Sequence, residues 1–286
     1  MVRQVLAVNS DHELKELCYM VKRYVRICFI LLLLIAVVGC RKETNLSTNN
    51  QSKKNEPLAP LVNAPNSNQV QISQASYTTT QTTPDGKVVT ATKYPGSIAV
   101  VVNKKIYLPH TYVPEDLVFP NVSFIFNEKI DKRKLRKEAA IALEKMFASA
   151  KKDGIYLGGA SGYRSYAAQV SVFNQYVKRD GYEKARTYSA IPGTSEHQTG
   201  LAIDVSASNG YCAVSSCFEG TKEAKWLESN SANFGYIIRY PKGKEHITGY
   251  KYEPWHIRYV GAGISKDMKS RGLTLEEYFG IFPILK

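Results

Sequence analysis

Two short segments of the sequence combine imidazole and carboxylate side chains in a pattern that could bind a metal ion. The first reads S-E-H-Q-T-G-L-A-I-D and contains His197 and Asp204, and the second reads Y-E-P-W-H and contains Glu253 and His256. Two histidines and one aspartate form a three-ligand set for Zn²⁺ with a fourth position open, which is typical of a catalytic site rather than a structural one. We therefore predict that His197, Asp204 and His256 bind one zinc ion, with Glu253 as the spare carboxylate.

The local sequence indicates how these side chains are brought together. Gly200 lets the chain turn from the His197 loop into a strand, in which Ala202 and Asp204 share one face. An aspartate inside an otherwise apolar strand is costly unless it is paired or bound to a cation. Pro254 prevents a regular ladder beside His256, so that both side chains of its segment can turn toward one site.

The rest of the C-terminal part alternates between helical and strand-like patterns without a strict βαβ repeat. We predict an α+β fold with a small, mostly antiparallel sheet and flanking helices. The expected helices cover residues 135–150, 165–179 and 221–234, the expected strands cover 155–160, 201–206, 236–240 and 256–260, and a short hairpin is expected over 97–108.

The N-terminal part is typical of a secreted lipoprotein. Ile27–Val38 is an apolar run of 12 residues after a basic stretch, which fits a signal peptide better than a membrane span of about 20 residues. The run is followed by Gly39-Cys40, and the stretch Val37-Val38-Gly39-Cys40 resembles a lipobox, so we expect a signal peptide over 1–39 and lipidation of Cys40. The alternative is an uncleaved membrane helix with a free cysteine. Met20 opens a normal basic leader, and we hypothesise that translation starts there.

Between the lipobox and the catalytic segments the composition changes. Of the 44 residues from 41 to 84, 28 are Ser, Thr, Asn, Gln or Pro. This segment therefore has too few apolar side chains to form a core. We expect a disordered tether over 40–90 and one catalytic domain over 91–286. The whole chain, with 44% hydrophobic and 22% charged residues, is neither wholly disordered nor a disulfide miniprotein. Its net charge of +13 is compatible with anionic lipid or wall polymer, and no nucleic-acid motif accompanies it.

Three ordered motifs resemble the VanY-type D-Ala-D-Ala carboxypeptidases and their L,D-carboxypeptidase relatives, zinc peptidases that share a fold with lysostaphin-type endopeptidases and the hedgehog signalling domain. The motifs are S-G-Y-R-S, S-E-H-Q-T-G-L-A-I-D and E-P-W-H, and the similarity covers about residues 95 to 280. The resemblance implies that His197, Asp204 and His256 hold the zinc. It also implies that Glu253 is the catalytic base, which takes the proton of a zinc-activated water.

The same resemblance assigns substrate contacts to Arg164, Gln169 and Ser195. Arg164 could hold the terminal carboxylate of the substrate or stabilise the oxyanion, and the alternative is a surface arginine at the start of a helix. Gln169 could face the cleft or simply be exposed. We expect a disulfide between Cys212 and Cys217, because a metal pair there would lack further ligands and the protein is expected outside the membrane.

Together these features predict a zinc carboxypeptidase that removes the C-terminal D-Ala from peptidoglycan stem peptides. L,D activity on tetrapeptides is slightly favoured over D,D activity on pentapeptides. The alternative from another class is a non-catalytic module that binds peptidoglycan with the same fold. We expect a monomer that is lipid-anchored to the outer face of the cytoplasmic membrane in a Gram-positive cell envelope, and no nucleic-acid partner.

Overall fold

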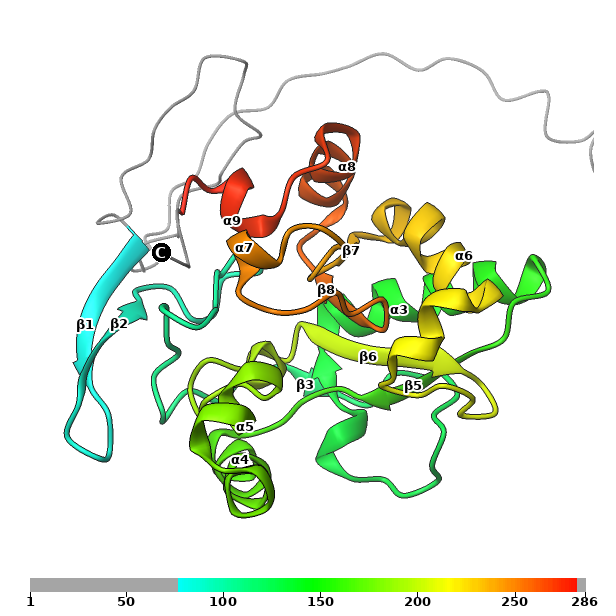
Figure 1. Cartoon of the computed structure of the whole chain (residues 1–286). Helices are drawn as coiled ribbons and strands as arrows, with labels where there is room; N and C mark the ends of the chain where they lie inside the picture. Colours follow the sequence, from blue (N-terminus) through cyan, green and yellow to red (C-terminus); the bar gives the residue numbers. More distant parts are fainter. Residues whose placement is uncertain (1–76, 282–286) are drawn as a thin grey trace, which may run out of the picture. The chain divides into compact units, whose positions relative to one another are not determined.

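A four-stranded antiparallel sheet forms the centre of the computed structural model, which describes residues 77–281 (Figure 1). The strand order is β5-β6-β8-β7, and each neighbouring pair is antiparallel. Each strand lies where the sequence predicts one, so the α+β class with an antiparallel sheet is confirmed. The bounds are Leu157–Ser161 (β5), Ala202–Ala207 (β6), Tyr236–Ile238 (β7) and His256–Tyr259 (β8).

The main core lies between this sheet and two of the predicted helices, α3 (Lys137–Lys152) and α6 (Lys222–Asn230). Helix α3 buries one apolar stripe at helical spacing, and the hydroxyl of Tyr236 on β7 donates a 2.7 Å hydrogen bond to the carbonyl of Ala139. The predicted third helix is shorter than expected, because the chain continues as a 3-10 turn, η4 (Ser231–Phe234). The stripe of α3 contains Ala139, Leu143, Met146, Phe147 and Ala150.

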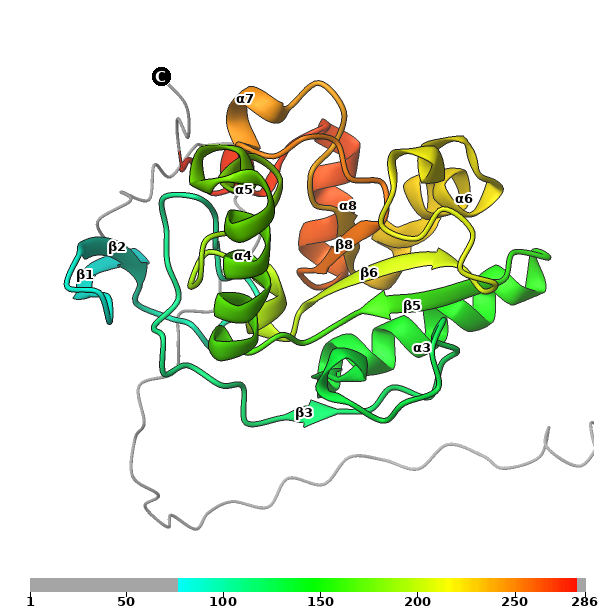
Figure 2. The same cartoon turned by 60° about the horizontal axis from the view of Figure 1, so that its bottom comes forward.

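Helix α4 (Tyr166–Asp180) is the predicted second helix, and it stands at the end of the sheet where β5 ends and β6 begins (Figure 2). Its start is capped by Ser165, whose hydroxyl accepts a hydrogen bond from the backbone of Ala168 at 3.2 Å. Helix α5 (Tyr182–Tyr188) follows after one glycine. This arrangement places Arg164, directly before the cap, beside His197, the predicted zinc ligand in the segment that leads into β6.

A second cluster of buried apolar side chains packs α8 (Ala262–Arg271) and α9 (Leu275–Tyr278) against β7 and Val260, the residue that follows β8. The sequence patterns do not predict these short helices. The remaining described elements are β1 (Thr78–Thr82), β2 (Val88–Thr92), β3 (Leu117–Val118), η1 (Asp131–Arg133), β4 (Leu135–Arg136), η2 (Glu196–Thr199), η3 (Ser216–Gly220) and α7 (Glu245–Thr248).

The hairpin predicted over 97–108 is wrong, because Ser97–Val102 forms no strand. Its valines still reach the core, but the carbonyls of Ile98 and Val100 accept hydrogen bonds from the buried guanidinium of Arg258, at 3.0 and 2.7 Å, instead of from a strand. The hairpin occurs earlier, where β1 pairs with β2. A tether that reaches residue 90 is therefore too long, since residues 78–82 and 88–90 belong to this hairpin.

The signal peptide over 1–39, the alternative start at Met20, the lipidation site Cys40 and most of the tether lie outside the described residues. Within residues 77–281, no helix is long and apolar enough to cross a membrane.

Gly200 forms the turn between the loop that carries His197 and strand β6. It ends η2 with φ +67°, in the left-handed region, and a Cβ there would lie 2.8 Å from Leu117 Cδ2 and 3.0 Å from Arg136 Cγ. The turn therefore requires glycine for two separate reasons, the backbone conformation and the space.

Substituting Gly200→Ala should destabilise the fold more than Gly154→Ala. Gly154 has φ +73°, but a Cβ there would meet no atom within 4 Å, so Gly154→Ala costs about 1 kcal/mol for the backbone alone. Gly200→Ala adds overpacking, for a total of about 2–4 kcal/mol. Urea unfolding of both variants measures the difference, and equal destabilisation would contradict the close packing around Gly200.

Candidate metal centre and active site

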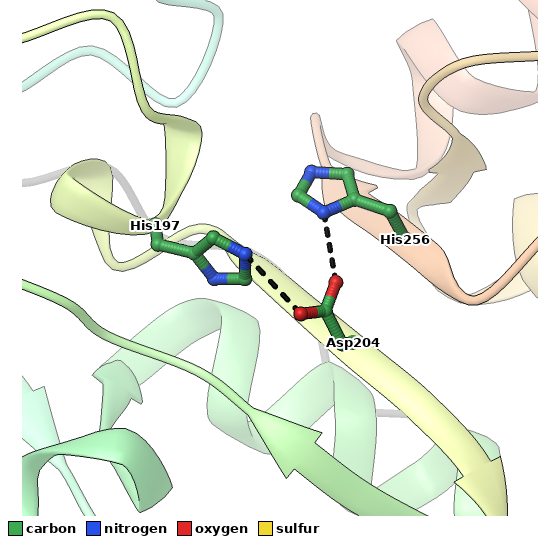
Figure 3. A group of neighbouring side chains, drawn as sticks. All are labelled: His197, Asp204 and His256. Carbon is green, nitrogen blue, oxygen red and sulfur yellow. Dashed lines mark hydrogen bonds and ion pairs between the residues drawn. The ribbon is translucent and has the colours of Figure 1, made fainter. Parts of the chain in front are cut away.

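Asp204 and His256 face each other across two neighbouring strands. They are direct register partners in the β6–β8 ladder, and Asp204 Oδ1 lies 2.9 Å from His256 Nδ1 (Figure 3). Opposed side chains of an antiparallel pair lie on the same face of the sheet. The ladder thus brings together two predicted ligands that are distant in the sequence.

His197 reaches the same point from η2. Its Nε2 atom lies 3.4 Å from Asp204 Oδ2, and its Nδ1 atom makes a 2.8 Å hydrogen bond with the carbonyl oxygen of Gly162. Because that carbonyl can only accept, Nδ1 carries the proton and Nε2 presents its lone pair to the site. Figure 3 shows the two imidazoles on either side of the Asp204 carboxylate.

The three side chains fit a zinc ion. One ligand atom from each lies within 4.8 Å of the others, and all three residues are buried. Two ligand atoms that are each about 2.0–2.1 Å from a tetrahedral ion lie roughly 3.3–3.4 Å apart. The 3.4 Å between His197 Nε2 and Asp204 Oδ2 matches this value, and the 2.9 Å between His256 Nδ1 and Asp204 Oδ1 is somewhat shorter. A carboxylate between two imidazoles also matches the donor chemistry of catalytic zinc.

The electrostatics of the site favour a bound cation. Burial would raise the pKa of Asp204, but His197 and His256 hold it well below its usual range. Burial lowers the pKa of His197, so this ring is neutral and able to act as a ligand. Burial would also lower the pKa of His256, yet the hydrogen bond to Asp204 and the nearby Glu196 carboxylate raise it to about 9. The carboxylates around His256 therefore stabilise positive charge at this position.

Glu253, the predicted base, lies in the turn that leads into β8. Its backbone N–H donates to the carbonyl of Tyr240 at 3.1 Å, and its own carbonyl accepts from the N–H of His256 at 3.1 Å. Burial is the main cause that raises the pKa of Glu253 to about 7, and the nearby Asp204 carboxylate also raises it. His256 and Lys104 lower this pKa, but by less. A carboxylate that titrates near neutral pH beside a metal site suits a general base.

Arg164 is held in place by two neighbours. Its Nη1 donates to Gln169 Oε1 at 2.9 Å, and its Nη2 donates to Ser161 Oγ at 3.1 Å. Its backbone N–H also donates to the carbonyl of His197 at 3.1 Å. Of the five guanidinium N–H donors, these side-chain contacts use two within the described residues, which leaves others for a ligand.

Gln169 is not an exposed polar residue, so that sequence-based alternative is wrong, and its substrate contact stays a prediction. The residue is 1% exposed, and its Nε2 donates to the carbonyl of Ala190 at 2.7 Å while its Oε1 accepts from Arg164. Its amide therefore orients the arginine. Ser195, buried at the start of η2, shows no side-chain capping bond there, and its substrate contact stays a prediction.

The predicted disulfide is present: Cys212 and Cys217 are bonded to each other, with their Cα atoms 5.5 Å apart, in the loop that follows β6.

Three residues near the metal group are not predicted from the sequence at all. These are Glu196, which belongs to the first motif, and the fully buried Arg239 and Arg258. A glutamate next to a metal-binding histidine is the one sequence signal that could have pointed to them.

The comparisons with known proteins agree with this geometry. The model of the VanY family, D-alanyl-D-alanine carboxypeptidase, matches residues 132–262. The putative carboxypeptidase YodJ of Bacillus subtilis is 52% identical over 186 residues, which cover 65% of this chain and 68% of the relative. The chain belongs to the VanY family. A D-alanyl-D-alanine carboxypeptidase of Enterococcus faecalis is 37% identical over 188 residues, covering 63% of this chain and 64% of its own length.

Solved structures extend the similarity to the whole described domain. The LdcB LD-carboxypeptidase has a TM-score of 0.68 at 44% identity and matches over 75% of this chain and 98% of its own. A vancomycin-resistance D,D-pentapeptidase VanY, solved as a variant with Zn(II), has a TM-score of 0.51 at 33% identity. This match covers 63% of the present chain and 97% of the VanY chain. Membership of the VanY family and the His-Asp-His group make this chain a zinc carboxypeptidase. The chain spans about two thirds of the curated relatives.

Burial of Glu253 predicts a stability cost that depends on pH. The pKa of its carboxyl is about 7 in the folded protein against 4.5 as the ordinary value, so the cost is absent below pH 4.5, grows as the pH rises and is complete above pH 7. In metal-free protein, Glu253→Gln should therefore be more stable than wild type at pH 8, on the order of 2 kcal/mol, and nearly equal at pH 5.

Urea unfolding in the presence of a chelator measures this difference at both pH values. A variant that is no more stable than wild type at pH 8, or a gain that does not shrink at pH 5, would contradict the partly buried position of this carboxylate.

Proposed function

We propose that this protein removes the C-terminal D-Ala from peptidoglycan stem peptides, with L,D activity on tetrapeptides preferred over D,D activity on pentapeptides. The observation that carries the proposal is the arrangement of Glu253 and Arg164 around the His197, Asp204 and His256 group. It combines a base that titrates near neutral pH with a fixed cation beside a metal centre. The higher similarity to the LdcB LD-carboxypeptidase than to the D,D-pentapeptidase supports the L,D preference.

The residues divide the work of hydrolysis. Bound zinc supplies Lewis-acid polarisation and a water molecule of lowered pKa. Glu253 accepts a proton from the attacking water and delivers it to the leaving amine of D-Ala, which requires that it be ionised at the start. Arg164, oriented by Gln169 and Ser161, holds the terminal carboxylate of the substrate with its remaining donors.

The surface next to Arg164 offers room for a peptide. An open hollow of about 450 Å³ is lined by Arg164, Tyr163 and Lys132, together with Asp131 and three neighbouring residues. In this proposal the hollow receives part of the substrate, and its opposite charges suit a peptide that carries both an amine and a carboxylate.

The location and anchoring also belong to the proposal. The lipobox at Cys40 and the basic excess of the chain support a protein that is lipid-anchored on the outer face of the cytoplasmic membrane and faces the wall. The Cys212–Cys217 disulfide supports an oxidising compartment. We further propose that the enzyme acts as a monomer.

Purified protein incubated with defined tetrapeptide and pentapeptide muropeptides tests the activity. We expect D-Ala release that is faster from the tetrapeptide, is lost with chelator and returns with zinc. Glu253→Gln should lower turnover by about 10²–10⁴-fold while zinc stays bound, because only the proton transfer is removed.

Mass spectrometry of the peptides and zinc analysis of the protein provide the readouts. Zinc-loaded wild type that binds muropeptides without releasing D-Ala would support a non-catalytic module instead. Release from the pentapeptide alone would contradict the L,D preference, and near-wild-type turnover of Glu253→Gln would contradict its role as the base.

A further inference from the structure

The second ring nitrogen of His256 faces a buried carboxylate. While Nδ1 faces Asp204 in the metal group, Nε2 is buried and lies 3.5 Å from Glu196 Oε2. Among the described residues, neither His256 Nε2 nor Glu196 Oε2 has a hydrogen-bond partner. Two buried polar atoms of complementary chemistry thus face each other behind the metal group.

The orientation of Glu196 is set by two arginines. Its Oε1 atom accepts hydrogen bonds from Arg239 Nε at 2.8 Å and from Arg258 Nη1 at 2.6 Å, and all three side chains are fully buried. Because Oε1 is taken up by these donors, Oε2 is the oxygen directed at His256.

The two arginines are also held by partners other than Glu196. Arg239 makes a two-pronged contact with Glu276 on α9, at 2.9 and 2.6 Å, and Arg258 donates to the backbone carbonyls of the 98–100 segment. The two guanidinium groups balance the charges of Glu196 and Glu276. The carboxylate behind His256 is therefore held in place by two guanidinium groups that are themselves fixed.

The two histidines need different partners because they present different nitrogens. His197 donates its Nδ1 proton to the carbonyl of Gly162, which leaves Nε2 for the metal. His256 presents Nδ1 to the metal group, so its proton must lie on Nε2. A metal-binding histidine usually donates its other N–H to a carboxylate or carbonyl, which fixes the tautomer and makes the ring a better ligand.

We infer that Glu196 is a positioning residue that accepts the Nε2 proton of His256 and so holds this ring in the tautomer that binds zinc through Nδ1. The inference rests on the proposed metal site and adds a requirement to it. The 3.5 Å separation is longer than an ordinary hydrogen bond, and the inference requires a shorter one in the zinc-loaded protein.

Glu196→Gln with Glu276→Gln as the matched control tests the inference. Both substitutions remove one carboxylate partner of Arg239, but only the first changes the group that faces His256. In the Glu196→Gln variant the amide oxygen stays with the arginine donors, so its NH₂ group points at Nε2. This donor favours the wrong tautomer, with the proton on Nδ1.

We expect Glu196→Gln to weaken zinc binding by about 10–100-fold and Glu276→Gln to change it by less than about threefold. Competition with a chromogenic chelator measures the affinity, and the absorption spectrum of the Co²⁺-loaded proteins reports the ligand geometry. Wild-type affinity in a folded Glu196→Gln variant would overturn the inference, and so would equal losses in the two variants.

A measurement on the wild type keeps the test decisive if Glu196→Gln does not fold. In zinc-loaded protein with ¹⁵N-labelled histidine, NMR should show a proton on His256 Nε2 that is protected from solvent exchange. A proton on Nδ1, or an unprotected Nε2 proton, would overturn the inference. Failure of the wild type to bind zinc at all would instead contradict the proposed function.

Discussion

The pairing of Asp204 with His256 across β6 and β8 is the contact on which the rest of the site depends. Because side chains alternate between the two faces of a strand, a slip of one residue would move one of these ligands to the opposite face. The register is held by the apolar neighbours Ile203 and Ile257, which are themselves partners in the ladder and lie in the main core. The packing of the core therefore positions the metal ligands.

The site combines this ladder with an unusual amount of buried charge. Glu196, Arg239, Arg258 and Glu276 form a neutral group with no solvent-exposed side chain, and removal of one member of such a group typically costs about 3–5 kcal/mol. The group links α9 to the metal centre through ion pairs, so the C-terminal helices stabilise a site to which they contribute no ligand. Glu253 shows the opposite balance, because its burial costs stability but gives it a pKa suited to proton transfer.

The sequence predicts the sheet because strands and amphipathic helices repeat with a period that local sequence records. It predicts the group of His197, Asp204 and His256 for a different reason, because their residue types form a zinc donor set within recognisable motifs. It does not predict β1, whose Thr-rich sequence has no apolar alternation and resembles a linker. It also does not predict the roles of Arg239 or Gln169. Arginine and glutamine are mostly exposed residues, and their burial depends on partners that lie far away in the sequence. Tertiary pairing of polar groups leaves no periodic signal.

Zinc K-edge X-ray absorption on the zinc-loaded full chain tests the three-ligand centre most directly. The structure predicts two imidazole nitrogens and one carboxylate oxygen at about 2.0–2.1 Å, a further light atom and no sulfur. A zinc–sulfur distance of about 2.3 Å, or scattering from a single imidazole, would contradict the site formed by His197, Asp204 and His256.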